Sequence, residues 1–504
     1  MSDGRSSVVV AERPNPGTPR GYEFPPFRRD RLANGMSVLV VDVPGRPLVS
    51  ALLVLANGAI DEASEFAGAT VLAARALTEG TERHDAVGLT EAAERLGASL
   101  HADAGWDATT IGVDVPIERL GPALELVAEV ATMPTFPAAE VERLRDERLN
   151  DLLQARADPR RRAEEVFADT IYAASSAYHR PSGGTPETVR GLERESVRAA
   201  YLRGADPANA TLVVAGELGG TDVVELSDRL FGRWPGVASG RSRADVEAEP
   251  ATRKRRVRVI HRPGAVQTEI RIGHVGLRRR TPDFHAVSVM SAILGGLFNS
   301  RLNMKLREEK GYTYGAGAGF DLRRGPGPFA ARAAVQTPVT VPAVLDTLAE
   351  LDAIRSGTVR DAELAAARDF LVGVFPLRFE TPGAIVGALS GIVVHDLPDD
   401  ELARYRDAIE AVTIDDVEAA ARTHVRPDEA QVVLVGDADA FLADLEAASL
   451  GELIVERDSG PAERATEEGV EGQLGPVDRE DEPGLPTEPE DAPGAPVEGV
   501  PGEA

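Results

Sequence analysis

The sequence predicts an α+β fold of two homologous domains, each a mainly antiparallel sheet packed with helices. An internal repeat is the first observation, because residues 197–216 and 417–436 align at a constant offset of 220. Identical residues occupy the pairs Val197/Val417, Ala199/Ala419, Ala200/Ala420, Pro207/Pro427, Ala210/Ala430, Val213/Val433 and Gly216/Gly436. The second observation is that strand-like and helix-like segments mix with hairpins, which favours an α+β fold over a doubly wound sheet.

The hydrophobic pattern predicts the elements of the first half. Strand segments are rich in Val and Leu, and the dipeptide Asn34-Gly35 forms a turn before the first of them. The predicted elements are strands at 36–43 and 48–56, helices at 66–77 and 88–96, a hairpin of 98–103 with 108–115, and a charged helix at 138–157. Each copy of the repeat then predicts a helix, a proline-containing turn and an apolar strand ending in glycine, followed by a helix at 223–231 or 440–448.

Composition sets the domain boundaries. From residue 461 to the end there are 13 acidic residues, 2 basic residues and 8 prolines, so this segment buries too little apolar surface to offset its chain entropy. The Gly- and Ser-rich, charged stretch in the middle suits a linker. We therefore expect a flexible arm at 1–22, a first domain at 23–235, a linker at 236–255, a second domain at 256–448 and a disordered acidic tail at 449–504.

Charge and cysteine content exclude several classes of function. The net charge is −27 and there is no basic patch interleaved with aromatic residues, so we expect no nucleic-acid partner. No apolar run reaches ~18 residues, which predicts no membrane-spanning helix. The first residues show no basic segment followed by an apolar one, as a signal peptide would. The absence of cysteine excludes disulfides and thiolate zinc sites and fits a cytoplasmic protein.

Several phrases, in the same order, resemble the M16 family of metallopeptidases, which includes pitrilysin, insulinase and the mitochondrial processing peptidases. They are Leu-Ala-Asn-Gly-Met at 32–36, Asn-Gly-Ala-Ile-Asp-Glu at 57–62, the helix frame at 68–81 and Gly-Ala-Ser-Leu-His-Ala at 97–102. The resemblance runs from about residue 27 to 445. It implies two homologous domains that together form half of a clamshell chamber.

The family's zinc helix carries His-x-x-Glu-His, and this chain lacks those residues. The resemblance places the two histidine positions on Val71 and Arg75, the general base on Ala74 and the distal glutamate ligand on Asp151. One carboxylate does not hold zinc tightly, so we expect no metal in this chain. Arg75 and Asp151 form an ion pair in place of the metal, or they are two unrelated surface charges. No two histidines lie at i,i+4 spacing beside a glutamate, and no Gly-x-Ser-x-Gly motif occurs.

The second half retains a phrase with an arginine and a tyrosine seven positions apart. Residues 295–319 predict a loop, a helix at 301–309 that Gly311 ends, and a strand that begins with 312–317. The resemblance identifies Arg307 and Tyr314 as the pair that binds the substrate carbonyl and stabilises developing negative charge at the other half's zinc. Alternatively, Arg307 pairs with a local glutamate and Tyr314 belongs to the core. Tyr312 competes for the tyrosine role but lies two residues too early.

The family binds substrate by pairing its backbone with an exposed strand. The corresponding substrate-binding residues are Ser99, Leu100, His101 and Ala102, and residues 329–335 are a candidate for the second copy of that strand. Ordinary sheet strands would give the same pattern.

These features predict the zinc-free subunit of a heterodimeric M16 zinc metallopeptidase. The expected partner is a subunit with an intact His-x-x-Glu-His motif, which would carry the zinc, and the expected substrate is a peptide or unfolded polypeptide. One alternative is a catalytically inactive scaffold or binding protein with this fold. Another is an autonomous hydrolase that uses a site without a recognised motif.

Overall fold

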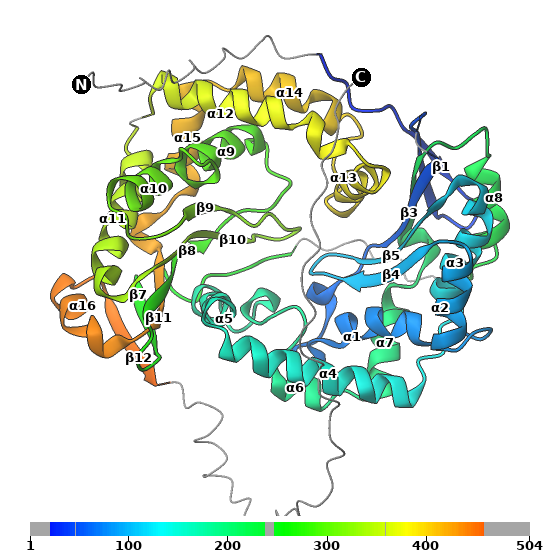
Figure 1. Ribbon diagram of the computed structural model, residues 1–504, viewed down its shortest axis with the longest axis horizontal. Helices are drawn as coiled ribbons and strands as arrows, with labels where there is room; N and C mark the ends of the chain where they lie inside the picture. The colour runs from blue at the N-terminus through cyan, green and yellow to red at the C-terminus, as the bar shows by residue number, and fades with distance from the viewer. Residues whose placement is uncertain (1–20, 46, 237–245, 358, 458–504) are drawn as a thin grey trace, which may run out of the picture. The chain divides into compact units, whose positions relative to one another are not determined.

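Two six-stranded sheets organise the protein in the computed structural model, which describes residues 21–457 apart from 46, 237–245 and 358 (Figure 1). The first sheet has the order β1 (Arg28–Arg31), β2 (Ser37–Asp42), β6 (Ala210–Gly216), β3 (Leu48–Leu55), β5 (Thr109–Pro116) and β4 (Ser99–Ala104). The second has the order β12 (Glu452–Arg457), β7 (Arg256–His261), β11 (Gln431–Gly436), β8 (Gln267–Val275), β10 (Pro328–Gln336) and β9 (Ala316–Phe320). The predicted α+β class is confirmed.

Both sheets are mixed, although antiparallel pairs dominate. In the first sheet only β2 and β6 run parallel. In the second, β7 runs parallel to both β11 and β12, and the other pairs are antiparallel. The two sheets therefore share a common five-strand order, in which β7, β11, β8, β10 and β9 repeat β2, β6, β3, β5 and β4.

Helices surround these sheets. Those of the first half are α1 (Ala69–Ala76), α2 (Ala86–Arg95), α3 (Leu120–Thr132), α4 (Ala138–Ala157), α5 (Pro159–Ile171), α6 (Pro186–Arg190), α7 (Arg194–Gly204) and α8 (Val223–Phe231). Those of the second are α9 (Phe284–Ser291), α10 (Arg301–Asn303), α11 (Thr340–Arg355), α12 (Asp361–Val374), α13 (Pro382–Val394), α14 (Glu401–Ala411), α15 (Ile414–His424) and α16 (Leu442–Ala448). The helices predicted at 66–77, 88–96, 138–157, 223–231 and 440–448 correspond to α1, α2, α4, α8 and α16. The repeat corresponds to α7–β6 and α15–β11.

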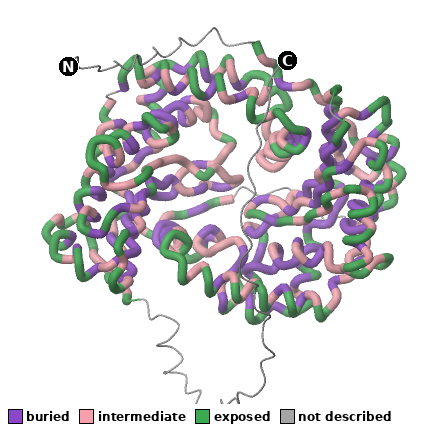
Figure 2. Tube along the Cα trace, in the orientation of Figure 1, coloured by how far each residue is buried: buried purple, intermediate pink, exposed green. Residues whose placement is uncertain are grey.

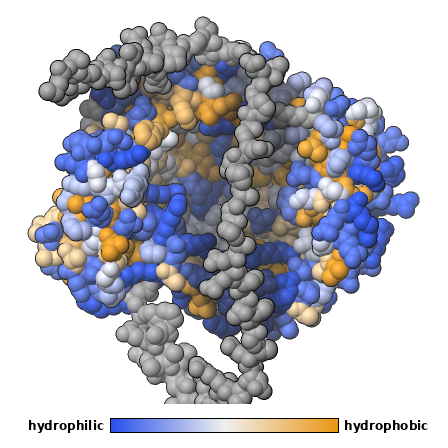
Figure 3. Space-filling view, in the orientation of Figure 1, coloured by the Kyte–Doolittle hydropathy of each residue, from blue (hydrophilic) through white to orange (hydrophobic). Residues whose placement is uncertain are grey.

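The central strands of the two sheets are buried along their whole length. Every residue of β6 and of β11 is buried, as their largely apolar sequences require. Figure 2 shows buried residues along the strands and exposed residues on the outer helices. Figure 3 shows that the outer parts of the same face are mainly hydrophilic. Both faces of each sheet must therefore be covered by other elements.

The two halves of the sequence exchange a helix to provide that cover. Helix α13, from the second half, packs on the first sheet through Ile385, Leu389 and Ile392, against side chains of β2, β3 and β6. Helix α5, from the first half, packs on the second sheet through Val166 and Phe167, against side chains of β7, β8, β10 and β11 (Figure 1). The predicted domain ranges 23–235 and 256–448 thus describe the sequence repeat, but neither range contains all the helices that cover its own sheet.

An ion pair with a buried arginine links α5 to the second sheet. Arg271 on β8 has a side chain that is 2% exposed, and its Nε lies 2.9 Å from Glu164 Oε1 on α5. Its Nη1 lies 2.9 Å from Glu269 Oε2 on the same strand. Arg271 is thus a buried cation with two carboxylate partners, one on its own strand and one, Glu164, that is 43% exposed on α5. Loss of the Glu164 contact would remove one of the two groups that neutralise the buried guanidinium.

Two boundaries differ from the prediction. The acidic tail was expected from residue 449, but Glu452–Arg457 forms β12, because it pairs with the free edge of β7. The linker was expected over 236–255, yet the amide of Ala173 donates to Glu249 O and the amide of Ala251 donates to Ile171 O, so this part is fixed beside α5. The arm at 1–20, linker residues 237–245 and the tail from 458 lie outside the described residues.

Among residues 21–457 that the structure describes, no single helix has the length and apolar character needed to cross a membrane. Only Asp361–Phe379 together with Pro382–Val394 meets both criteria, and this pair is bent by 114°.

Leu389→Ala tests the helix exchange. Leu389 is fully buried between α13 and the first sheet, so its truncation should lower the free energy of unfolding by about 2–5 kcal/mol. Leu377→Ala is the matched control, because Leu377 is 62% exposed and should change stability by less than ~0.5 kcal/mol. Urea unfolding followed by circular dichroism measures both, and equal small effects would contradict the assigned packing.

Candidate functional site

Helix α1 occupies the frame of the zinc helix, and buried groups fix its N-terminus. Gly68 precedes the helix with φ +94°, and an added Cβ would lie 2.8 Å from Gly183 O, so this position requires glycine. The buried carboxylate of Glu62 accepts hydrogen bonds from the amides of Gly68, at 3.0 Å, and Thr70, at 2.5 Å. Burial raises the pKa of Glu62, and these hydrogen bonds oppose that shift. The helix is therefore firmly placed.

The face of α1 that would carry the metal ligands is apolar or cationic. Ala74 is fully buried, while Val71 and Arg75 are partly exposed. Arg75 Nη1 lies 3.4 Å from Asp151 Oδ2 on α4, which agrees with the predicted ion pair. The two side chains are 38% and 45% exposed, so this pair contributes little to stability.

Another group of possible metal ligands is His261 with Asp437 and Asp439, whose ligand atoms lie within 4.8 Å of one another. The backbone amide of Ala438 donates to His261 Nδ1 at 3.1 Å, so the neutral ring carries its proton on Nε2, the atom nearest Asp439. Asp437 accepts from the amide of Gly264. These contacts explain the cluster as local structure without a metal.

Arg307 lies on a firmly anchored helical segment. Helix α10 continues as the π-helical η8 (Met304–Glu309), so the predicted helix at 301–309 is helical throughout. Arg301 at its start forms two hydrogen bonds of 2.9 Å with Glu363 on α12, and the side chains are 10% and 14% exposed. The Arg307 guanidinium is 36% exposed, with Cζ 4.4 Å from the centroid of the Phe298 ring and Nε 3.5 Å from Glu308 Oε1.

Tyr314 lies in a loop, so the prediction that a strand begins at 312 is wrong, and so is the alternative of a core tyrosine. Strand β9 starts at Ala316, because Thr313 Oγ1 donates to Gly315 O at 2.9 Å and accepts from the Gly315 amide at 3.1 Å. Such local bonding competes with strand pairing. The Tyr314 side chain is 93% exposed. Gly311 ends the helix with φ +64°, as predicted.

The predicted substrate-binding strand is an edge strand. Strand β4 pairs with β5 on one side only within the described sheet, and Ser99 and His101 are exposed while Leu100 and Ala102 are half-buried. The suggested second copy at 329–335 is wrong, because it lies in β10, which pairs on both sides. The counterpart of β4 is β9, whose alternating Gly and Ala residues hide the resemblance in the sequence.

Comparison with known proteins gives the family. A model described as "Insulinase (Peptidase family M16)" matches residues 37–180, and one described as "Peptidase M16 inactive domain" matches residues 191–371, which together exceed half of the chain. The chain belongs to peptidase family M16.

The relatives of this M16 chain include proteins named as proteases and one named as a non-peptidase. An uncharacterized zinc protease of Mycobacterium tuberculosis is 27% identical over 429 residues, covering 81% of this chain and 93% of its own. The "Non-peptidase homolog YmxG" of Helicobacter pylori is 24% identical and covers 64% of this chain and 74% of its own. The solved peptidase M16 inactive domain from Pseudomonas fluorescens has a TM-score of 0.75 at 24% identity, covering 81% of this chain and 98% of that one.

The zinc that the family name implies does not fit α1 of this M16 chain. Valine and alanine have no ligand atom, and the Arg75 guanidinium is a fixed cation that would repel a metal ion. Asp151 is already paired with Arg75. The helix thus has the family's frame without its metal chemistry.

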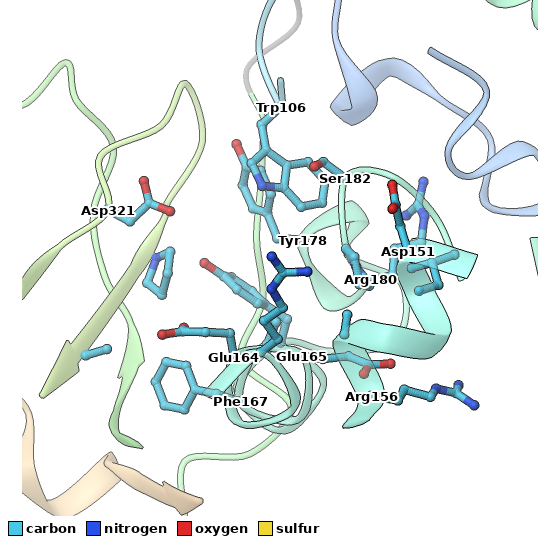
Figure 4. A pocket seen from close by; sticks show the side chains of 18 of the residues that line it. Trp106, Asp151, Arg156, Glu164, Glu165, Phe167, Tyr178, Arg180, Ser182 and Asp321 are labelled. Atoms are coloured by element: carbon cyan, nitrogen blue, oxygen red, sulfur yellow. The ribbon is translucent and has the colours of Figure 1, made fainter. Parts of the chain in front are cut away.

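Sequence reasoning missed a pocket of about 420 Å³ between the end of α4 and α5. Figure 4 shows Trp106 and Tyr178 on one side, α5 with Glu164, Glu165 and Phe167 opposite them, and Asp321 and Asp151 toward the two ends. The pocket's residues span more than 200 positions, from Trp106 to Arg332, so only the folded chain brings them together. The run of three arginines at 160–162 in an acidic chain is the one local signal.

The connection between β9 and β10 closes one side of this pocket by docking on the first half. The Arg324 amide donates to Asp107 Oδ2 at 3.0 Å, and the Gly325 amide donates to Tyr178 Oη at 3.1 Å. Tyr172 Oη donates to Pro326 O at 3.0 Å. Burial raises the pKa of both tyrosines, so both hydroxyls stay protonated; Tyr172 donates to the connection and Tyr178 accepts from it.

A double-mutant cycle tests the Arg75–Asp151 pair. Arg75→Ala and Asp151→Ala should couple by about 0.2–1 kcal/mol in the free energy of unfolding, because the pair is close but partly exposed. Pairing Arg75→Ala with Asp146→Ala is the control, since Asp146 lies on the same helix and is 69% exposed. Equal coupling energies in both cycles would mean that Arg75 and Asp151 are two unrelated surface charges.

Glu363→Gln tests the anchor of the segment that carries Arg307. Burial raises the pKa of Glu363, but hydrogen bonds from Arg301 and Arg360 outweigh burial and lower it to about 2, from an ordinary value of 4.5. A depressed carboxylate pKa stabilises the fold above pH 4.5, and this stabilisation is lost as pH falls from 4.5 towards 2. Unfolding measured from pH 7 to 3 should show a deficit of about 1.5–3 kcal/mol for the variant at pH 7, narrowing below pH 4.5.

Glu410→Gln is the control for that measurement, because Glu410 is exposed on α14. A deficit for Glu363→Gln that stays constant over this pH range would argue against an ionised Glu363 as the anchor.

Proposed function

We propose that this chain is the zinc-free subunit of a heterodimeric M16 metallopeptidase. It would close the chamber around a peptide substrate and present Arg307 and Tyr314 to the reacting peptide bond. The zinc would come from a partner subunit with an intact His-x-x-Glu-His helix, since α1 of this chain has no residues to hold it.

The exposure of Tyr314 is the observation that carries the proposal. Tyr314 is 93% exposed at the centre of a loop fixed at both ends, so its ring and hydroxyl are available to another molecule, and tyrosine is enriched at binding surfaces because it joins an apolar ring to a polar group. The loop is fixed because the Gly311 amide donates to Arg307 O at 3.0 Å and the Ala316 amide donates to Asn303 Oδ1 at 3.2 Å. Tyr314 therefore presents a phenol hydroxyl to the outside from a defined position.

The chemistry of the two side chains suits a carbonyl oxygen that becomes negatively charged. Within the described part of the chain, the closest carboxylate to Arg307 is that of the neighbouring Glu308, at 3.5 Å, and its guanidinium lies against an exposed ring, so it retains donors for a ligand. A guanidinium and a phenol hydroxyl both donate hydrogen bonds that strengthen as charge develops on the acceptor. Their role would be to orient the substrate carbonyl and to stabilise its anionic form.

The free edge of β4 supports binding of an extended peptide. Strand β4 pairs with β5 along one edge, and no strand lies along its other edge within the described sheet. A peptide strand could pair with the backbone of Ser99–Ala104 along that edge. Gly112 on β5 leaves space for the His101 imidazole, because an added Cβ would lie 2.4 Å from its Nε2. The histidine is thereby held on the sheet surface beside the proposed peptide path.

The alternative, a catalytically inactive scaffold, is supported by the name of one relative. The H. pylori relative is called a non-peptidase homolog, so a zinc-free M16 chain without any catalytic role is the second candidate. The two candidates differ in whether Arg307 and Tyr314 affect turnover.

Arg307→Ala and Tyr314→Phe in a complex with the zinc-bearing subunit test the proposal. Each should lower kcat for a fluorogenic peptide by about 10²–10³ without dissociating the complex, because each removes a donor to the developing anion. Activity should appear only in the mixture of the two subunits. Size-exclusion chromatography checks assembly.

Tyr312→Phe is the matched control, because Tyr312 packs against the second core and should leave kcat within about twofold. Unchanged turnover in both Arg307→Ala and Tyr314→Phe would remove their catalytic role and favour the scaffold. Zinc-dependent cleavage by this chain alone would refute both candidates.

A further inference from the structure

The pocket beside α5 concentrates positive charge in a protein whose net charge is −27. Six of its lining residues are arginines and four are acidic. The arginines are Arg148, Arg156, Arg161, Arg180, Arg323 and Arg332. Six arginines in one pocket are unexpected in a protein of acidic composition. Their contacts show whether carboxylates neutralise them.

The four acidic groups are already matched. Asp151 pairs with Arg75, Glu164 with Arg271, Glu165 with Arg162 and Asp321 with Arg323, at 2.6–3.4 Å. Three of those four arginines lie outside the pocket lining. The carboxylates of the pocket are therefore already neutralised by other arginines, so positive charge exceeds negative charge in the pocket.

Three arginines show this surplus most clearly. Arg148 donates from Nε to Gly183 O at 3.0 Å, and Arg161 is exposed on α5; neither has a carboxylate within 4.0 Å among the described residues. Arg180 is 13% exposed, and its Nη2 is buried without a hydrogen-bond partner among those residues, 3.9 Å from Glu62. Both oxygens of Glu62 already accept amides of α1. Burial lowers the pKa of Arg148 and of Arg180, as expected of cations that lack a close counter-ion.

The rest of the wall is aromatic. Trp106, Phe167, Tyr172 and Tyr178 line the pocket, and the hydroxyls of both tyrosines are engaged with the β9–β10 connection. Trp106 and Tyr178 pack edge to face at 5.1 Å, with Arg323 4.9 Å and 4.7 Å from the two rings. About 420 Å³ is enough for two or three amino-acid residues.

We infer that this pocket binds a peptide segment through a carboxylate, with a neighbouring apolar side chain against the aromatic wall. Arg148, Arg161 and Arg180 provide the donors, and the carboxylate supplies the counter-charge that the pocket lacks. The carboxylate is either the C-terminus of a peptide or an acidic side chain within it. The inference deepens the proposed function, on which it rests for the peptide nature of the ligand, by giving the substrate class as acidic.

Calorimetric titration of the full chain, without any partner, tests the inference. The probes are acetyl-Ala-Ala-Phe with a free carboxylate, the same peptide as its amide, and acetyl-Ala-Glu-Phe-amide and acetyl-Ala-Gln-Phe-amide. The free acid or the Glu peptide should bind at least tenfold more tightly than its neutral counterpart. The more tightly bound of the two identifies the source of the carboxylate.

Arg161→Gln is the variant of choice because Arg161 is exposed, so its replacement keeps the fold intact. It should weaken binding of the acidic probe about tenfold and reduce the loss of affinity with added salt. Arg160→Gln is the matched control, since Arg160 is the preceding exposed residue of the same helix and does not line the pocket. It should leave the affinity within twofold.

Equal binding of charged and neutral probes, no binding of any probe, or an unchanged affinity in Arg161→Gln would overturn the inference. None of these results depends on assembly with a zinc subunit. Conversely, unchanged turnover in the Arg307 and Tyr314 variants would refute the proposed catalytic role without affecting the peptide affinity measured here.

Discussion

Burial of both faces of the two sheets is the constraint on which the rest of the structure depends. Every residue of β6 and β11 is buried and most of them are apolar, so neither sheet can leave a face in water. In each sheet, one face is covered by a helix from the other half of the sequence. Helix α13 covers the first sheet in this way, and helix α5 covers the second. The two sequence repeats are consequently interdependent, and the buried Arg271 guanidinium adds a charged contact to Glu164 on α5.

That exchange also positions the pocket. Helix α5 has one side on the second sheet, and its other side faces the end of α4 and the loop that carries Tyr178 and Arg180. The β9–β10 connection then docks on Asp107 and Tyr178 and closes the remaining side. The packing of α5 therefore covers the second sheet, and together with the docked β9–β10 connection it creates a pocket lined by arginine and aromatic side chains.

Helix α1 keeps the frame of the family's zinc helix, although its sequence has no zinc ligands. Helix α1 keeps its glycine N-terminus and its buried Glu62 cap, because these hold the helix whether or not a metal is present. Arg75 lies beside Asp151, so a fixed cation stands near the carboxylate that would otherwise ligate zinc. Arg148 on α4 is close enough to Arg75 for their repulsion to lower its pKa further, after burial.

The sequence by itself determined the α+β class, the repeat at an offset of 220, the family and the loss of zinc ligands. These follow from local periodicity and from residue types, which do not need long-range contacts to be recognised. It also placed Arg75 and Asp151 at neighbouring positions of the family frame but left open whether they pair, which the structure shows they do at 3.4 Å. Only the tertiary structure decided the helix exchange, the β12 edge strand, the loop position of Tyr314 and the arginine pocket. Each of these depends on segments far apart in the chain or on competition between local and sheet hydrogen bonds, and neither leaves a periodic signal in the sequence.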